Sequence, residues 1–135
     1  MVIVLVAGWL SACSGTDMSN FQFGRAPTEP PADPNKFPAD YKPEVAEFMR
    51  RYLDNPRRVR DAYIATPVQK PVGNTPQYLT CVRYNPRGTD NKYEGPKQNL
   101  VLFLSGKLNQ FLPDDPQLCA GLAYQRYPEI ENMVP

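Results

Sequence analysis

Residues 99–112 read NLVLFLSGKLNQFL, and this stretch decides the fold class. Its first part, residues 99–104, is apolar on both faces, which is typical of a central strand that is covered on both sides. Ser105-Gly106 then supplies a two-residue hairpin turn, because glycine adopts a positive φ without strain. Residues 107–112 complete the hairpin. The stretch therefore predicts an antiparallel pair of strands, with residues 99–104 as a central strand of a sheet.

Two segments that precede this hairpin are expected to extend the sheet. Residues 77–84 (QYLTCVRY) are rich in β-branched and aromatic side chains and are followed by Asn85-Pro86. Residues 62–66 (AYIAT) predict another strand, with a second helix as the alternative. The stretch between these two segments is expected to be a loop, because it is rich in residues that form turns, namely Pro67, Pro71, Gly73, Asn74 and Pro76.

Two helices are expected to flank the sheet. An amphipathic helix that ends at Asn55-Pro56 is predicted by apolar residues at helical spacing, namely Val45, Phe48, Met49, Tyr52 and Leu53. Asp115-Pro116 is typical of an N-cap and a first-turn proline, and predicts a short helix through about residue 123. Residues 124–135 are expected to be irregular. We therefore expect an α+β fold: a small, mostly antiparallel sheet of three to four strands, an N-terminal amphipathic helix and a short C-terminal helix.

The chain before this domain begins with an apolar run. Residues 2–10 (VIVLVAGWL) carry no charge and are too few to span about 30 Å of hydrocarbon, but they suit the apolar region of a signal peptide. A buried strand is the alternative. The residues that follow the run are rich in proline, so we expect an extended tether over residues 13–39, a compact domain over 40–130 and a tail over 131–135.

The apolar run ends in Leu10-Ser11-Ala12-Cys13, which resembles the lipobox of bacterial lipoproteins. The resemblance implies that residues 1–12 are a lipoprotein signal peptide and that Cys13 carries the lipid. More than one acyl chain anchors a protein stably to a membrane. Ser14 follows the cysteine, which by the same resemblance favours the outer membrane, with the domain facing the periplasm.

Cys81 and Cys119 remain, an even pair in an oxidising compartment. Cys81 lies in an expected strand and Cys119 in the expected short helix, so a disulfide between them would clamp this helix to the sheet. The alternative is a reactive or metal-binding thiol pair, but their spacing matches no CxxC or zinc motif. We expect the disulfide, with no metal and no other cofactor.

The composition restricts the chemistry that is available. The chain has 15 basic and 14 acidic residues and no histidine. The lack of histidine removes every Ser/His and Cys/His catalytic pair and the commonest zinc ligand. A net charge of +1 argues against nucleic acid as a partner. We therefore expect no catalytic residues and a protein that is not an enzyme.

Candidate binding residues lie in two segments. Five arginines fall within residues 50–60, and the planar guanidinium group binds two oxygens of a phosphate or carboxylate at once. The alternative is a solvated face that nearby acidic residues balance. Residues 85–97 form a long polar loop, a type of segment that often carries function. The candidate partner-binding residues are Arg57, Arg58, Arg60, Arg87 and Tyr93.

As a whole, the sequence resembles the small envelope lipoproteins of alphaproteobacteria. The likeness rests on the lipobox and on residues 55–62, 81–85 (CVRYN) and 118–121 (LCAG). It implies an envelope location and a disulfide, and no particular activity. We expect a lipid-anchored periplasmic module that acts by contact, with the membrane and an envelope protein as partners and the oligomeric state left open. The alternative is an accessory or inhibitor protein that binds a small ligand or an envelope enzyme through residues 85–97.

Overall fold

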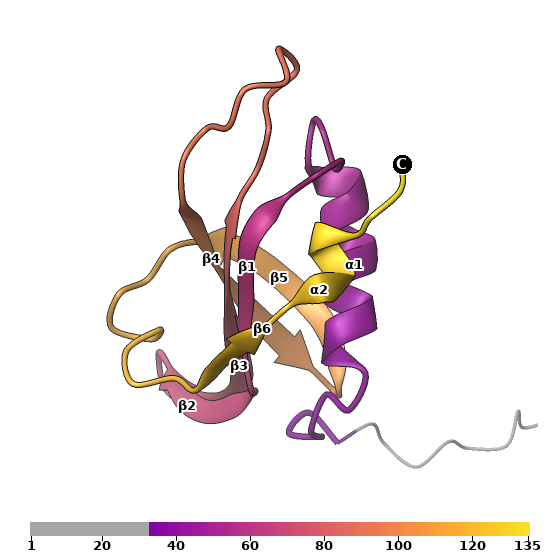
Figure 1. The fold of residues 1–135 in the computed structure, drawn as a ribbon. Coiled ribbons are helices and arrows are strands. Elements are labelled where there is room, and N and C mark those ends of the chain that lie inside the picture. The colour runs from indigo at the N-terminus through magenta and orange to yellow at the C-terminus, as the bar shows by residue number, and fades with distance from the viewer. Residues whose placement is uncertain (1–32) are drawn as a thin grey trace, which may run out of the picture. The chain divides into compact units, whose positions relative to one another are not determined.

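An antiparallel sheet of six strands organises residues 33–135, which are the residues that the structure, a computed structural model, describes (Figure 1). Cys13, the expected signal peptide and most of the expected tether lie outside the described residues. The elements are α1 (Tyr41–Tyr52), β1 (Arg60–Ala65), β2 (Val68–Val72), β3 (Thr75–Asn85), β4 (Lys97–Leu104), β5 (Lys107–Pro113), β6 (Tyr124–Arg126) and α2 (Pro128–Glu131).

The strands lie in the order β5-β4-β3-β1-β6, with β2 paired to β3 outside this path. The eleven-residue β3 is the longest strand. It pairs with β4 along one edge, while its other edge is shared by β2 in its first half and β1 in its second half. The α+β class is confirmed, but the expected number of three to four strands is wrong, because the sheet has six.

The hairpin predicted over residues 99–112 is confirmed. Strands β4 and β5 pair around Ser105-Gly106, and both turn residues have a positive φ (52° and 76°), as the hairpin turn requires. Of the residues 62–66, the first four form part of a strand and not of a second helix, since β1 covers Arg60–Ala65.

Strand β2 occupies the proline-rich stretch that was expected to be a loop. Gly73, with a φ of +63°, and Asn74 form a two-residue turn between β2 and β3. Pro71 lies opposite Pro76, one position from this turn. In an antiparallel hairpin such a pair exchanges no backbone hydrogen bonds, so the missing N–H groups cost the ladder nothing.

The short helix expected from Asp115 to about residue 123 does not form. The Asp115 carboxylate accepts hydrogen bonds from the backbone N–H groups of Gln117 and Leu118, as a cap does, but the chain continues as turns. Lys70 Nζ donates to the carbonyl oxygens of Leu118 and Ala120 (2.8 and 2.9 Å), which a longer helix would use itself. The short helix is instead α2, which lies within the residues 124–135 that were expected to be irregular, and β6 precedes it.

Side chains alternate across β3 and β4 and build a core on each face of the sheet. On one face, β3 and β4 contribute Val82, Tyr84, Val101 and Phe103 to a cluster with the buried Val45 and Met49 of α1 and Ile130 of α2. On the other face, the cluster is formed by Leu79, Cys81, Leu100, Leu102 and Cys119. Figure 1 shows the helices on one side of the sheet and residues 114–123 on the other.

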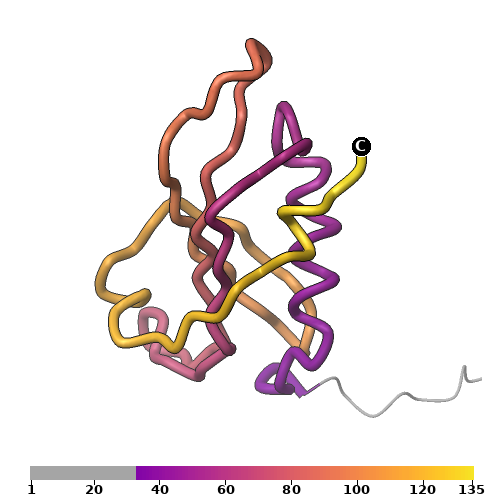
Figure 2. Tube along the Cα trace, viewed as in Figure 1, coloured from indigo at the N-terminus to yellow at the C-terminus, as the bar shows by residue number. Residues whose placement is uncertain are grey.

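Residues 33–38, which belong to the expected tether, pack on the domain. The N–H of Ser105 donates to the Pro34 carbonyl (3.2 Å), the Phe37 ring meets the Tyr78 ring edge-to-face at 5.4 Å, and Pro38 is buried. These contacts lie at the Leu104 end of β4. The loop of residues 85–97 extends from the opposite end of this strand (Figure 2). Among residues 33–135, no helix is long and apolar enough to cross a membrane.

Candidate functional site

The loop of residues 85–97 has a fixed shape, because its two arms bond to each other. The N–H of Gly88 donates to the Lys92 carbonyl (2.8 Å), and the N–H of Glu94 donates to the Pro86 carbonyl (2.9 Å). The buried Asn85 side chain accepts a hydrogen bond from the N–H of Gly95 (3.0 Å). The loop is therefore a narrow continuation of β3 and β4 beyond the sheet.

Side chains tie this loop to the segment between α1 and β1. Asn55 Nδ2 donates to the Gly88 carbonyl and to Asn91 Oδ1, both at 3.1 Å. From the loop, the Tyr93 hydroxyl donates to the Arg58 carbonyl (2.9 Å). The two segments that the sequence singled out separately are thus held side by side.

Three of the five predicted binding residues meet in one stack. The guanidinium carbon of Arg60 lies 3.7 Å from the centroid of the Tyr93 ring, and that of Arg87 lies 5.9 Å from it. Both distances fall within the range of cation–π attraction. We call Arg60, Tyr93 and Arg87 the arginine–tyrosine stack. It presents two fixed cations at the base of the loop.

The other two predicted residues lie beside the stack and not in it. The side chains of Arg57 and Arg58 are exposed, and line a shallow hollow together with residues 131–135 of the C-terminal tail. Arg58 reaches the stack only through its carbonyl oxygen, which accepts the Tyr93 hydrogen bond.

The arginines of residues 50–60 differ in how they are neutralised. Arg50 and Arg51 both pair with Glu47, and the hydrogen bond from Arg50 is the main cause that lowers the pKa of Glu47. With the described residues, Arg57, Arg58 and Arg87 form no ion pair. Arg60 lies 3.7 Å from Asp61 and Arg51 lies 3.9 Å from Glu47, and both of these pairs are exposed and therefore weak. The balanced-face alternative thus describes Arg50 best, whereas Arg57, Arg58 and Arg87 have charge available for a partner.

A cavity of about 630 Å³ lies beside the base of the loop, and no motif in the sequence predicts it. Its walls come from the end of α1, the end of β3, the start of β4 and the end of β5. Tyr84 donates its hydroxyl hydrogen to Asn99 Oδ1 (2.6 Å), and Asn99 Nδ2 donates to the Leu112 carbonyl (3.0 Å). Burial raises the pKa of Tyr84 above its ordinary value of 10.0, so the phenol stays protonated beyond pH 10. Only the register of three strands brings these residues together, so no local motif could have predicted the cavity.

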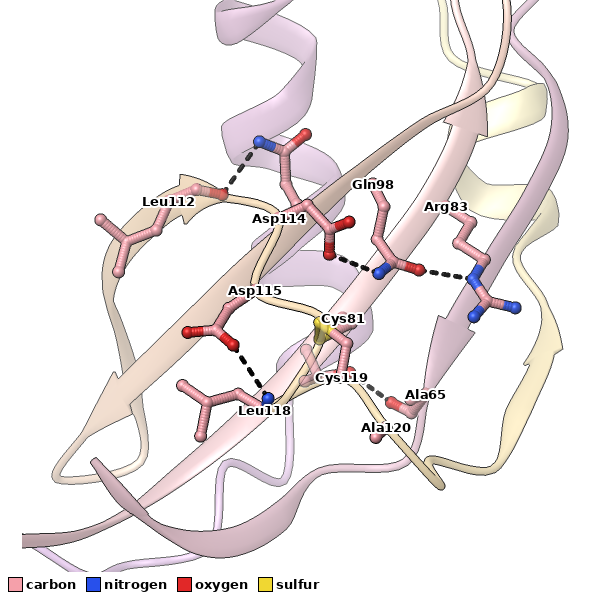
Figure 3. Close-up of a disulfide and its surroundings, with 12 residues drawn as sticks. Ala65, Cys81, Arg83, Gln98, Leu112, Asp114, Asp115, Leu118, Cys119 and Ala120 are labelled. Carbon is pink, nitrogen blue, oxygen red and sulfur yellow. Dashed lines mark hydrogen bonds between the residues drawn. A yellow bond between two sulfur atoms is a disulfide. The ribbon is translucent and has the colours of Figure 1, made fainter. Parts of the chain in front are cut away.

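The predicted disulfide between Cys81 and Cys119 is confirmed, and its Cα atoms are 5.8 Å apart. Figure 3 shows it joining the sheet to the segment that covers the second core. Beside it, Gln98 accepts a hydrogen bond from Arg83 Nε and donates one to Asp114. Arg83 also stacks on the Tyr124 ring, with its guanidinium carbon 3.8 Å from the centroid. Arg83 is therefore used to hold this face of the protein together.

Within residues 33–135, no three Cys, Asp or Glu side chains are grouped in a way that could hold a metal ion. Cys13, the predicted lipidation site, lies outside the described residues. Comparisons of the chain with protein-family models, curated proteins and solved structures found no match.

Proposed function

We propose that this protein is a lipid-anchored, non-catalytic interaction module of the periplasm, which binds an acidic envelope protein through Arg57, Arg58 and the arginine–tyrosine stack. The observation that carries this proposal is the stack itself, in which the guanidinium carbons of Arg60 and Arg87 lie 3.7 and 5.9 Å from the centroid of one tyrosine ring. Guanidinium groups that are already held in place lose less side-chain entropy when they bind a carboxylate. Such a surface is suited to contact and needs no group that performs chemistry.

The position of the stack favours a partner protein over the lipid headgroups of the anchoring membrane. Residues 33–38 pack at the Leu104 end of β4, whereas the loop that carries Tyr93 and Arg87 starts from the Lys97 end (Figure 2). Eight residues at about 3.3 Å each separate the two ends of this strand by roughly 25 Å. The stack therefore lies at the end of the domain opposite to residue 33.

The anchor is proposed from the sequence. The resemblance of Leu10-Ser11-Ala12-Cys13 to a lipobox supports lipidation at Cys13, and Ser14 supports sorting to the outer membrane. Metabolic labelling with an alkyne fatty acid tests this step. The label is expected on the wild-type chain and not on Cys13→Ser, and recovery of unmodified Cys13 from cells would contradict the anchor.

Site-specific photo-crosslinking in cells tests the contact surface. A photoreactive residue at Thr89, which is exposed near the tip of the loop, is expected to give a crosslinked envelope protein. The double variant Arg60→Glu/Arg87→Glu should abolish this product by reversing the charge of the stack. The matched control is Arg50→Glu/Arg51→Glu, which makes the same charge change at arginines that already pair with Glu47, and it should keep the product. Equal loss in both variants, or no loss in either, would refute the proposal.

A further inference from the structure

We propose that the cavity beside the loop is a second binding site, which takes a neutral saccharide about the size of a disaccharide. This site develops the alternative that residues 85–97 bind a small ligand. It shares Arg87 with the arginine–tyrosine stack, but it does not rest on the proposed protein contact.

The cavity has the size and placement of a small-molecule site. Its volume of about 630 Å³ lies within the range of about 300–1,000 Å³ that is usual for such sites. It forms where a helix end, three strands and a fixed loop converge, so its walls are largely set before any ligand arrives. Because the walls of a preformed cavity are already ordered, less conformational entropy is lost when a ligand binds.

An exposed aromatic platform forms one wall. Tyr52 is 52% exposed although it contacts two other rings, Phe111 at 4.8 Å and Phe48 at 5.7 Å between centroids. Phe111 also lines the cavity, and it lies 4.8 Å from Phe48. The three rings contact one another and so fix their orientations, while part of the Tyr52 ring remains open to solvent. An open, immobile ring is suited to the C–H face of a pyranose, which is the apolar side of an otherwise polar molecule.

The remaining walls provide hydrogen-bonding groups of both kinds. Asn99 is held by Tyr84 and the Leu112 carbonyl, and it retains a second amide hydrogen for a ligand. Glu94 and Lys97 line the cavity as an ion pair, so one acceptor and one donor lie next to each other. Sugar hydroxyls donate and accept at neighbouring positions, and they match such a set.

The charges around the cavity favour a neutral ligand. Three carboxylates and two cations line it, and Glu94 and Lys97 neutralise each other. Asp114 accepts a hydrogen bond from Gln98. No cluster of one sign is left to select an anion or a cation. A wholly apolar ligand would leave the second amide hydrogen of Asn99 and the Glu94–Lys97 pair without hydrogen-bond partners on the ligand side.

NMR titration of the full chain with cellobiose, maltose and N,N′-diacetylchitobiose tests the inference. At least one of these neutral disaccharides should bind with a Kd of about 10 mM or tighter, and shift the signals of Tyr52, Asn99 and Phe111. Tyr52→Ala should weaken this binding at least about tenfold, whereas Tyr52→Phe keeps the ring and should bind like the wild type. Asn109→Ala, at an exposed position of β5 outside the cavity, should leave the affinity unchanged.

Three results would overturn the saccharide site. These are no shift with any of the three sugars, tighter binding of glucose 6-phosphate than of every neutral probe, or an affinity that Tyr52→Ala does not change. Circular dichroism of each variant shows whether it is folded. If the sugars fail to bind while the crosslink from Thr89 persists, the saccharide inference falls and the proposed protein contact stands.

Discussion

Tyr93 has two contacts that can be separated by substitution. Its ring lies under the Arg60 guanidinium, while its hydroxyl group bonds to the Arg58 carbonyl. Arg58 has a φ of 55°, in the left-handed region that non-glycine residues rarely adopt, so this hydrogen bond helps to hold an unfavourable backbone conformation. The ring should therefore matter for the partner, and the hydroxyl group for the stability of the turn.

We predict that Tyr93→Phe keeps the crosslink from Thr89, because the ring that orients Arg60 and Arg87 is retained. The lost hydrogen bond should lower the free energy of unfolding by about 0.5–1.5 kcal/mol. Tyr93→Ala should lose most of the crosslink as well. Urea unfolding and crosslinking yield measure the two effects, and equal yields for the two variants would mean that the stack plays no part in the contact.

Tyr84 and Tyr127 make the stability of the folded protein depend on pH in the alkaline range. Burial raises the pKa of both phenols above their ordinary value of 10.0, and the Tyr127 hydroxyl donates a hydrogen bond to the Lys42 carbonyl. Above about pH 10 the unfolded chain loses these protons while the folded chain keeps them. Stability from both groups is therefore fully present below pH 10 and is lost as pH rises toward the raised pKa values.

We predict that the free energy of unfolding falls above pH 10 by about 1.4 kcal/mol per pH unit for each of these two tyrosines. Tyr127→Phe should be less stable at pH 7, because the hydrogen bond to Lys42 is lost, but its alkaline decline should be shallower by about 1.4 kcal/mol per pH unit. Urea unfolding between pH 8 and 11 measures this slope. A decline as steep as in the wild type would exclude Tyr127 as its source.

At the scale of elements, the segment of residues 114–123 forms no helix or strand, and a disulfide attaches it to the sheet. It covers the second core without forming a helix, and it is held by the disulfide and by Lys70. The bridge joins residues 38 positions apart, and closing a loop of this length constrains the unfolded chain by about 4 kcal/mol in the chain-entropy model.

We predict that Cys119→Ser lowers the free energy of unfolding by about 4 kcal/mol and brings the melting temperature to that of the reduced wild type. Adding a reductant should then have no further effect on the variant. Calorimetry with and without reductant checks both statements, and equal melting of the variant and the oxidised wild type would contradict them.

The loop of residues 85–97 depends on one side chain outside it. We predict that Asn55→Ala, which removes the hydrogen bonds to Gly88 and Asn91, speeds amide exchange at Gly88 and Glu94 by about tenfold, because a local opening becomes about 1.4 kcal/mol easier. Asn109→Ala, at an exposed position of β5, serves as the control. Unchanged exchange in the Asn55 variant would show that the loop holds its shape alone.

Local signals explain which elements the sequence could predict. The β4–β5 hairpin followed from an apolar run and one turn, and β3 from its side-chain types. Strand β2 was missed because the prolines at 71 and 76 lie at positions that need no N–H group, and β6 because three residues show no periodicity. The helix after Asp115 was expected wrongly, because Lys70 and Cys81 lie far away in the sequence and hold that segment as turns.

The candidate sites, like the elements, could be predicted only as far as local features of the sequence indicate them. Arg60 and Arg87 were identified through charge and loop length, which are visible in the sequence. Their approach to one ring depends on Asn55 and Tyr93, which join two separate segments. The cavity could not be predicted, because its walls come from a helix end and three strands that only the fold brings together.

At the scale of the whole molecule, the folded domain begins before α1, because residues 33–38 pack on the sheet. Pro38 is buried, and residues 34 and 37 contact the hairpin turn at Ser105 and the Tyr78 ring. We predict that a chain starting at residue 33 melts at the same temperature as the full chain. A chain starting at residue 39 should be less stable by about 1–3 kcal/mol, because these contacts are lost. Calorimetry of the two truncated chains distinguishes them, and equal stability would show that residues 33–38 add nothing.

The length of the chain before the domain and the position of the stack together limit how far from the membrane anchor the stack can reach. With the chain attached at Cys13 as proposed, the 20 residues from 13 to 32 can extend at most about 70 Å, and the stack lies roughly 25 Å further along the domain. A partner fixed in the same envelope within this radius meets the stack at an effective concentration of about the millimolar range. A contact whose Kd lies below this concentration is then occupied most of the time. Lengthening the tether would reduce its occupancy without any change to the binding surface.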